Sequence, residues 1–596
     1  MKRILLLSIW LCVPALVHAQ PGRAPELSAV AFRHVSVVDV VNGRVLPEQT
    51  VIVREGRILK VGPSDQIPAP DDVLEVDGRG RFLIPGLWDM HTHWYEPQAL
   101  GLFIANGVTG IRMMLGVPMH HQWRESISAG KLVGPRMRIA SGVFDGPKPV
   151  WPRSISVSNE PEARAAVRQS RDAGADFIKV YELLPREAYF AIADESKKLG
   201  IPFVGHIPET ILAQEAAEAG QKSIEHLTGM RLACSSQREE LLREWGRIIR
   251  ETLDAGESKP WIRALKELGP RIDETYDPEV ASQLFALFKE KGTWHCPTLT
   301  VGYSIGHLND PEFTRDPRLV YMSPAMRNSW NPKNDFRFRD ATDEDLANRR
   351  ERVKKDMKIV RDLHQAGVPL LAGTDTGNPY CFPGFSLHDE LDLLVQSGLS
   401  PADALRAATV NPTRFMGRTE TMGTIAEDRV ADLVLLDDNP LVDIHNTRNI
   451  RGVMAAGRWF DRPTLDALLD RIKKSASREP IGFVLFRMLE SENAAAAIAR
   501  YRDLRENQPD RYDFSEVQLN MLGYRLLEFG RIDDAVEILR FNVELFPDSW
   551  NTYDSLGEAY LKQGNKELAA KNYRRSLELN PDNQGAVDAI KKLESY

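Results

Sequence analysis

The chain has 596 residues, of which 43% are hydrophobic and 27% are charged, and its formal net charge is −8. A single hydrophobic core rarely organises more than about 300 residues, so the length predicts several domains. The mildly acidic charge gives no electrostatic basis for binding nucleic acid, and we expect no nucleic-acid partner.

The first residues have the order of a secretory signal. Lys2 and Arg3 precede an apolar run over residues 4–17, and the pattern closes on the small residue Ala19. This order predicts a signal peptide over residues 1–19 and an exported protein, periplasmic or secreted. The run is shorter than the about 20 apolar residues of a membrane-spanning helix, and no later stretch approaches that length, so no stable membrane insertion is expected.

Removal of the signal would leave three cysteines, Cys234, Cys296 and Cys381. An odd and sparse set excludes a disulfide framework as the basis of the fold. We predict buried free thiols, with a single disulfide bridge as the alternative.

Two β-rich segments flank the centre of the chain. Residues 27–85 combine short apolar strands with turn pairs such as Asn42-Gly43, and residues 418–465 have the same character. We predict one discontinuous β-sandwich formed by both flanks.

Residues 86–417, between the flanks, alternate short apolar strands with helical segments such as 162–173, 186–199 and 211–219. The eight predicted strands are 86–93, 108–114, 136–144, 176–181, 202–206, 222–226, 293–299 and 368–375. Eight strand–helix units predict an α/β fold of the (β/α)8 TIM-barrel type. A charged helical insertion, about residues 234–291, is expected to form a lid or flank after the sixth strand.

The last part of the chain, residues 480–596, contains an internal repeat. Gly523 and Pro547 recur as Gly557 and Pro581, in each case 34 residues later. This period resembles tetratricopeptide repeats (TPR) and predicts an all-α helical repeat domain, with two clear copies and one degenerate copy. The repeats are expected either to hold a protein or peptide partner or to pack against the barrel, and self-association remains open.

Metal-ligand residue types occur near the ends of five predicted barrel strands. They are His91 and His93 on the first strand, Lys179 on the fourth, His206 on the fifth, His226 on the sixth and Asp375 on the eighth. Active sites of TIM barrels lie at the carboxyl ends of the strands, and side chains at i and i+2 share one face, so these residues are expected to converge on a metal site. Lys179 could contribute only with an uncharged nitrogen; the alternative is that it faces out of the barrel.

The chain resembles the amidohydrolase superfamily, in its exported imidazolonepropionase-like and prolidase-like branch. The resemblance covers about residues 27–462 and includes Pro-Gly-Leu-Trp-Asp-Met-His-Thr-His at 85–93, Glu225-His226 and Gly-Thr-Asp-Thr at 373–376. It implies two divalent metal ions, usually Zn²⁺. By resemblance, His91, His93 and Asp375 would hold one ion, His206 and His226 the other, and N6-carboxylated Lys179 would bridge them.

Such a centre predicts a hydrolase. Two ions would lower the pKa of a bridging water and polarise a carbonyl, and Asp375 would move a proton to the leaving nitrogen. We therefore predict metal-dependent hydrolysis of an amide-like carbon–nitrogen bond, in Xaa-Pro dipeptides or N-acyl amino acids. The alternatives are a hydrolase of a lactone, imidazolone or other cyclic amide, and a non-catalytic binding protein that carries TPR-like repeats.

Further polar residues lie near the predicted ligands. Candidates for holding the ligand histidines are Asp89, Thr92 and Glu225. Candidates for binding substrate, with a purely structural hydrogen bond as the alternative, are Tyr181, His295 and His388.

Overall fold

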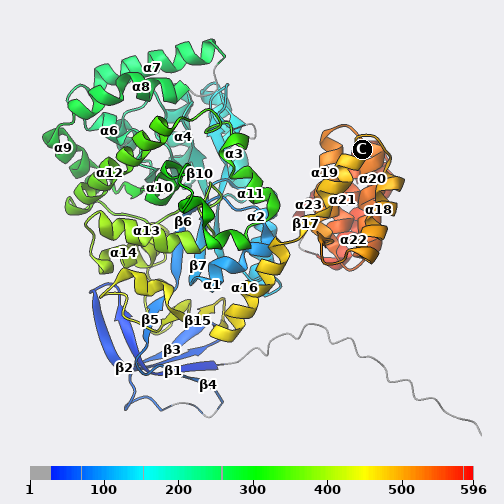
Figure 1. The fold of residues 1–596 in the computed structure, drawn as a ribbon, viewed down its shortest axis with the longest axis horizontal. Coiled ribbons are helices and arrows are strands. Elements are labelled where there is room, and N and C mark those ends of the chain that lie inside the picture. The colour runs from blue at the N-terminus through cyan, green and yellow to red at the C-terminus, as the bar shows by residue number, and fades with distance from the viewer. Residues whose placement is uncertain are drawn as a thin grey trace, which may run out of the picture.

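The computed structural model describes residues 29–68, 70, 72–151, 154–256, 260–581 and 583–594, so the predicted signal peptide lies outside the described residues. Figure 1 shows a barrel with a β-sheet at one end and a separate group of repeat helices beside it. No helix in the described ranges has the length and apolar character needed to cross a membrane.

The two flanks of the chain meet in one eight-stranded sheet. The first flank supplies β1 (Ala29–Asp39), β2 (Arg44–Arg54), β3 (Arg57–Pro63), β4 (Leu74–Asp77) and β5 (Phe82–Pro85), and the second supplies β14 (Leu433–Leu436), β15 (Ile450–Ala455) and β16 (Arg458–Asp461). The flanks join where β14 pairs antiparallel with β5. β1 pairs with β4 through its first half and with β5 through its second, on either side of an irregularity near His34. The two flanks therefore lie side by side, as strands of a single eight-stranded sheet.

Seven parallel strands form a nearly closed barrel. In spatial order they are β6 (Leu87–Thr92), β7 (Val108–Met113), β8 (Arg136–Asp145), β10 (Phe177–Val180), β11 (Phe203–Gly205), β12 (Ser223–Glu225) and β13 (Trp294–Cys296), while the short β9 (Ile155–Ser156) pairs with β8. Strands β7, β8, β10 and β11 carry valine together with isoleucine or phenylalanine, as expected of a parallel sheet covered on its outer face.

The predicted eighth strand closes the barrel without a regular ladder. The Leu371 amide donates to the His295 carbonyl oxygen, and the Met90 amide donates to the Ala372 carbonyl oxygen, so this closing segment joins β13 to β6. Its tight passage depends on Gly373, where a Cβ atom would lie 2.5 Å from Cys296 Sγ and 2.8 Å from the His91 amide nitrogen. Any side chain at position 373 would push the closing segment away from β6.

Helices surround the barrel. Those of the first five units are α1 (Gly101–Ala105), α2 (Pro118–Ser128), α3 (Glu160–Asp172), α4 (Arg186–Leu199) and α5 (Ala213–Glu218). The predicted insertion after the sixth strand contains α6 (Met230–Ala233), α7 (Arg238–Asp254), α8 (Pro260–Glu274) and α9 (Pro278–Lys291). α7 and α8 pack together at the end of the molecule opposite the eight-stranded sheet (Figure 1).

A second insertion follows β13. It runs through α10 (Leu299–Gly306), η2 (Phe313–Arg315), η3 (Pro317–Tyr321), α11 (Pro324–Ser329) and η4 (Pro332–Asn334) to the long helix α12 (Asp343–Gln365). The remaining elements on this part of the chain are η1 (Pro97–Ala99), α13 (Phe385–Gln396), α14 (Pro401–Ala408), α15 (Val410–Phe415), η5 (Ile444–Arg448) and α16 (Arg462–Ala476). Cys234, Cys296 and Cys381 are buried and free, as predicted.

The repeat region is helical throughout its described residues apart from a short pairing of β17 (Glu479–Pro480) with β18 (Tyr512–Asp513). Its helices are α17 (Ile481–Leu489), α18 (Ala494–Asn507), α19 (Glu516–Glu528), α20 (Ile532–Leu545), α21 (Trp550–Gln563), α22 (Lys566–Leu579) and α23 (Gln584–Glu594). A Cβ atom at Gly523 would lie 2.5 Å from the Leu539 side chain, and one at Gly557 would lie 3.1 Å from Tyr573. The repeated glycines thus let paired helices cross closely.

One ion pair joins the eight-stranded sheet to the barrel and allows a first prediction. Arg136 Nε donates to Asp432 Oδ2 at 2.6 Å, while Asp432 Oδ1 accepts from the Ala456 amide. A double-mutant cycle with Arg136→Met and Asp432→Asn should give a coupling free energy of about 1–2 kcal/mol, between the values typical of exposed and buried pairs. Denaturant unfolding measures it.

The exposed pair Arg247–Glu251 on α7, at 2.7 Å, is the control for this cycle. Its coupling should be only about 0.3–0.5 kcal/mol. Equal coupling in the two cycles would show that Arg136 and Asp432 do not hold the sheet to the barrel.

Candidate metal centre

The six residues predicted as metal ligands converge at the carboxyl end of the barrel. His91 Nε2 and His93 Nε2 lie 3.3 Å apart. Asp375 Oδ1 lies 3.4 Å from His91 Nε2 and 3.3 Å from His93 Nε2. The ring centre of His226 lies 4.5 Å from that of His91 and 4.8 Å from that of His206. His91, His226 and Asp375 can bring one ligand atom each within 4.8 Å of the others, which is a spacing that one metal ion can span.

Lys179 points into this cluster. Its residue is 1% exposed. Burial is the main cause that lowers the pKa of the four histidines, His91, His93, His206 and His226, and the positive charge of Lys179 lowers each of them further. Its aliphatic chain passes so close to the backbone of β11 that a Cβ atom at Gly205 would lie 3.1 Å from Lys179 Cδ. The amine Nζ is buried and has no hydrogen-bond partner among the described residues.

This unpartnered amine tests whether the residues fit a binuclear metal centre. Burial lowers the pKa of Lys179 to about 8, which makes the uncharged amine accessible near neutral pH. A buried polar nitrogen without a partner is costly, whereas a carbamate on the same nitrogen would offer two oxygens to cations held by the histidines. The donor set of four imidazoles, one carboxylate and one modifiable lysine therefore fits two divalent ions.

Three of the four histidines form a side-chain hydrogen bond through their Nδ1 atom. His91 Nδ1 donates to Glu225 Oε2 at 2.8 Å, and His206 Nδ1 donates to Glu182 Oε1 at 3.0 Å. His226 Nδ1 donates to Thr298 Oγ1 at 2.6 Å, because the Thr298 hydroxyl itself donates to the Pro297 carbonyl oxygen. In all three, the Nε2 lone pair is therefore left for a metal ion.

Burial also keeps these imidazoles neutral. It lowers the pKa of His91, His206 and His226 well below the ordinary value for histidine. Neutral imidazole is the form that binds a metal ion, so the protein environment favours the binding form of all three rings.

Of the three residues predicted to hold ligand histidines, only Glu225 does so, by accepting from His91 Nδ1. Asp89 and Thr92 bond to backbone groups instead. Arg112 Nη2 donates to both Glu225 carboxylate oxygens at 2.8 Å, and both residues are buried. Asp89 accepts from the amides of His91 and Thr374, which fixes the backbone rather than a ring. Thr92 donates to the Arg112 carbonyl oxygen and holds no ligand.

The backbone adopts an unfavourable conformation at three residues of the candidate metal centre. His226 and Asp375 both have φ of 58°, and Thr298 has φ of 49°, a left-handed conformation that non-glycine residues seldom adopt. Such outliers persist only where the surrounding structure imposes them, and they commonly mark functional sites.

The structure brings Tyr181 to the cluster but not His295 or His388. The Tyr181 ring lies 4.1 Å from the His206 ring, and its hydroxyl accepts from Trp151 Nε1 at 3.0 Å. His295 packs outside the barrel against Phe288 of α9, at 4.7 Å between ring centres. The ring nitrogens of His388 lie 2.9 Å from Thr447 Oγ1 and 3.0 Å from the Asn106 carbonyl oxygen, so both are engaged.

Several residues around the cluster were not singled out by the sequence. They are Arg112, Trp151, Glu182, Thr298, Arg337 and Arg349. Glu182, which follows the predicted strand 176–181, and Thr298, near the end of the predicted strand 293–299, had a positional signal that could have identified them. Arg337 and Arg349 lie in the second insertion, where no motif marks them.

Comparison of the sequence with known protein families supports a functional role for these six residues. The sequence pattern of the amidohydrolase family matches residues 82–460, which include all six candidate ligands. The chain belongs to the amidohydrolase family. A tetratricopeptide repeat matches residues 555–583.

Among curated relatives, this amidohydrolase is 48% identical over 52 residues to "Adenine deaminase 2" of Jannaschia sp. (strain CCS1), covering 9% of this chain and 8% of the relative. It is 37% identical over 78 residues to "Imidazolonepropionase" of Geobacillus kaustophilus (strain HTA426), covering 13% of this chain and 18% of the relative. The matched segments thus span less than a fifth of the length of these relatives.

Solved structures match over most of the amidohydrolase. A putative prolidase from Bifidobacterium longum is 25% identical, with a TM-score of 0.53 over 75% of this chain and 99% of that chain. A bottromycin amidohydrolase is 24% identical, with a TM-score of 0.58 over 76% of this chain and 94% of that chain, and supports the fold alone. The family match over residues 82–460 and the match to a putative prolidase both support a hydrolase.

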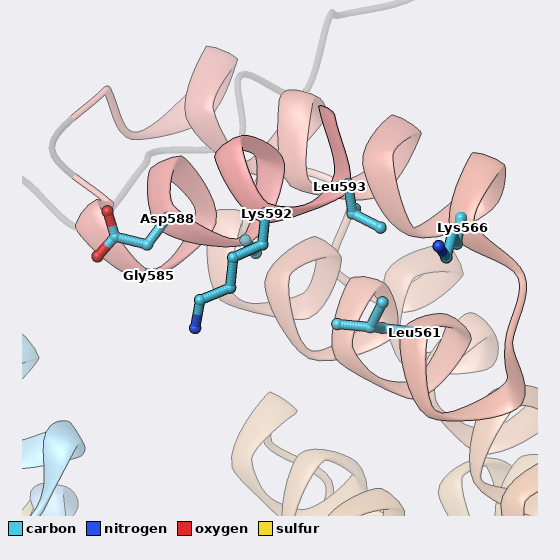
Figure 2. Close-up of a pocket in the computed structure, with 7 residues that line it drawn as sticks. Leu561, Lys566, Gly585, Asp588, Lys592 and Leu593 are labelled. Atoms are coloured by element: carbon cyan, nitrogen blue, oxygen red, sulfur yellow. The ribbon is translucent and has the colours of Figure 1, made fainter. Parts of the chain in front are cut away.

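A separate hollow lies among the repeats (Figure 2). It has a volume of about 520 Å³ and is lined by Leu561, Lys566, Gly585, Asp588, Ala589, Lys592 and Leu593. Figure 2 shows the leucines between Lys566 on one side and Lys592 and Asp588 on the other. This hollow shares no residue with the metal centre.

The carboxylate beside His206 allows a second prediction. Glu182→Gln should weaken metal binding roughly 10-fold to 100-fold, because a neutral amide accepts a weaker hydrogen bond from His206 Nδ1 than a carboxylate does and its NH2 group can favour the other tautomer. Titration of the metal-free protein against a competing chelator measures the affinity. The control is Glu187→Gln, an exposed position on α4, and equal affinities in the two variants would contradict the role of Glu182.

Proposed function

We propose that this chain is an exported, binuclear metal-dependent amidohydrolase that cleaves an amide-like carbon–nitrogen bond in a small substrate. The substrate classes favoured are N-acyl amino acids and Xaa-Pro dipeptides. The observation that carries the proposal is the buried, unpartnered Lys179 amine within a cluster of four histidines and Asp375.

In this proposal His91, His93 and Asp375 would hold one divalent ion, His206 and His226 would hold the other, and carboxylated Lys179 would be the ligand that they share. When bound, the ions, most suitably Zn²⁺, supply Lewis-acid polarisation of the substrate carbonyl and a water of lowered pKa. Carboxylation joins uncharged Nζ to carbon dioxide with loss of one proton, and the lowered pKa of Lys179, about 8, supports that step.

Asp375 is the proposed proton carrier. Burial raises the pKa of Asp375 to about 6, while the charges of Lys179 and Arg337 act in the opposite direction. A carboxylate that titrates close to neutral pH can accept a proton from the attacking water and return it to the leaving nitrogen as the carbon–nitrogen bond breaks.

Exposure at the cluster indicates the side from which substrate enters. The side chains of His93 and Asp375 are 24% and 12% exposed, whereas His91 is fully buried. A substrate that enters on this side would meet His93 and Asp375 first. Tyr181, whose ring lies against that of His206 and whose hydroxyl is bonded to Trp151, is proposed to contact it there.

A second candidate substrate class is a cyclic amide, such as an imidazolone, or a lactone. The short matches to imidazolonepropionases and adenine deaminases favour it, while the longer match to a putative prolidase favours the first class. For the repeats we propose a protein or peptide partner, supported by the tetratricopeptide match.

The hydrolase proposal gives a third prediction. The zinc-loaded protein should hydrolyse members of a panel of Xaa-Pro dipeptides, N-acyl amino acids, lactones and cyclic ureides. Asp375→Asn should abolish turnover and keep the fold, since the amide cannot accept the proton. Initial rates and circular dichroism measure both effects. Substantial activity in Asp375→Asn would contradict the proton-carrier role, and hydrolysis of lactones alone would contradict carbon–nitrogen specificity.

Export gives a fourth prediction. The full-length chain, expressed in a bacterium that has a general secretion system, should lose residues 1–19 and accumulate outside the cytoplasm. Intact-mass measurement of the purified protein identifies the new N-terminus. A cytoplasmic protein that keeps these residues would contradict the proposal.

A further inference from the structure

Thr298 stands at the start of α10, in the position that usually caps a helix. A serine or threonine there normally accepts a hydrogen bond from a backbone amide of the first helical turn. Ser323, Thr342 and Ser400 do so at the starts of α11, α12 and α14. The Thr298 hydroxyl caps no amide of α10 and instead accepts from His226 Nδ1 at 2.6 Å. The hydroxyl is thus used for a metal-ligand candidate rather than for its own helix.

Glu390, which lies on α13, caps α10 instead. Its Oε1 accepts from the Leu299 amide at 3.1 Å, and its Oε2 accepts from the Thr300 amide and the Thr300 hydroxyl, each at 2.8 Å. The amide of Val301 donates to the Thr298 carbonyl oxygen at 3.2 Å. These bonds satisfy the amides of residues 299–301 without the Thr298 hydroxyl.

The Glu390 carboxylate is fully buried and forms no ion pair within the described ranges. A buried carboxylate is costly unless hydrogen-bond donors surround it, and the positive end of a helix dipole stabilises it further. Thr298 and Thr300 are only 2% and 3% exposed. The connection from Glu390 to Thr298 therefore lies in the protein core, where water gives little competition for these hydrogen bonds.

We propose that Glu390 is a positioning residue for His226: because it caps α10, it leaves the Thr298 hydroxyl to hold the His226 ring. This inference rests on the proposed function, in which His226 is a metal ligand. Without the Glu390 carboxylate, the amides of Leu299 and Thr300 would lack their acceptor, and the Thr298 hydroxyl would turn to the helix as an ordinary cap does. His226 would then lose the Nδ1 partner that leaves its Nε2 lone pair for a metal ion.

The two proposed metal positions should respond differently to this loss. His91, which belongs to the other position, donates to Glu225, and Glu225 accepts from Arg112. That support comes from β7 and β12 rather than from α10 and α13. Loss of the Glu390 carboxylate should therefore weaken mainly the binding of the ion on the His226 side.

Metal titration of Glu390→Gln tests the inference. The glutamine oxygen can accept from α10, but its NH2 group cannot, so part of the cap is lost. The metal-free full-length protein is titrated with Zn²⁺ against a competing chelator, and two binding steps are expected in the wild type. In Glu390→Gln one step should weaken roughly tenfold or more, and the other by less than about threefold.

Glu195→Gln is the matched control for this titration. It makes the same substitution at a buried carboxylate on α4 that pairs with Arg164 and Arg168. Both binding steps should stay as in the wild type. An unchanged affinity in Glu390→Gln, an equal weakening of its two steps, or the same loss in Glu195→Gln would overturn the inference.

A double-mutant cycle shows whether Glu390 acts through Thr298. Thr298→Val removes the hydroxyl at nearly constant shape and should weaken the same binding step. Adding Glu390→Gln to Thr298→Val should change the affinity little further, because the hydrogen bond to His226 is already lost. Thr298→Ser keeps the hydroxyl and should bind both ions as the wild type does. Additive losses in the double variant would contradict the proposed role.

Thermal unfolding of the metal-free variants distinguishes positioning from general destabilisation. Weakening of both binding steps together with a lower unfolding midpoint would show a purely structural role and would overturn the inference. If Glu390→Gln does not fold, Glu390→Asp takes its place, since it keeps the buried charge and shortens its reach by one methylene group. It should weaken the same step to a smaller extent.

The outcome for this inference can be told apart from the outcome for the proposed function. Binding of two ions without hydrolysis of any substrate in the panel would contradict the proposed function, and the comparison of affinities would still decide the role of Glu390. A wild-type protein that binds no ion would overturn both.

Discussion

The buried ion pair between Arg112 and Glu225 is the interaction on which the catalytic end of the barrel depends. Arg112 belongs to β7, yet its Nε donates to the Met90 carbonyl oxygen on β6 at 2.5 Å, and its Nη2 donates to Glu225 on β12 at 2.8 Å. Glu225 in turn holds the His91 ring. Two buried charges of this kind are costly unless fully paired, so their geometry ties three strands and one ligand into a single arrangement. The rings of Phe177 and Phe415 enclose the guanidinium and exclude water from it.

The barrel and its strand-end residues could be predicted because both depend on local sequence patterns. Apolar runs bounded by glycine identify strands, and residues at the carboxyl ends of parallel strands meet whatever the loops do. His295 shows the limit of this reasoning. It lies on a barrel strand, but Cys296 takes the inward position and His295 the outward one, and only the register of β13 beside β12 decides between them. A shift by one residue would have exchanged the two faces.

Residues that depend on tertiary contacts could not be predicted. Arg337 comes from an insertion whose polar sequence is typical of a solvated loop, and it contacts Asn378, next to Asp375 in the fold, only because the insertion folds back over the barrel end. The positive φ angles at His226, Thr298 and Asp375 are similar in origin, since none of these residue types requires such a backbone. The sequence therefore identifies the groups that would hold metal, whereas only the three-dimensional fold identifies the residues that surround them.

The joining of β5 to β14 has a consequence for how this protein is made. The two strands pair side by side in the finished sheet, yet Leu436 is synthesised about 350 residues after Pro85. Until the ribosome has delivered the second flank, one edge of the first flank remains open, and open strand edges invite aggregation. The edge of β5 therefore stays unpaired until residues 433–436 are available, and completion of the sheet is a late step in the maturation of the chain.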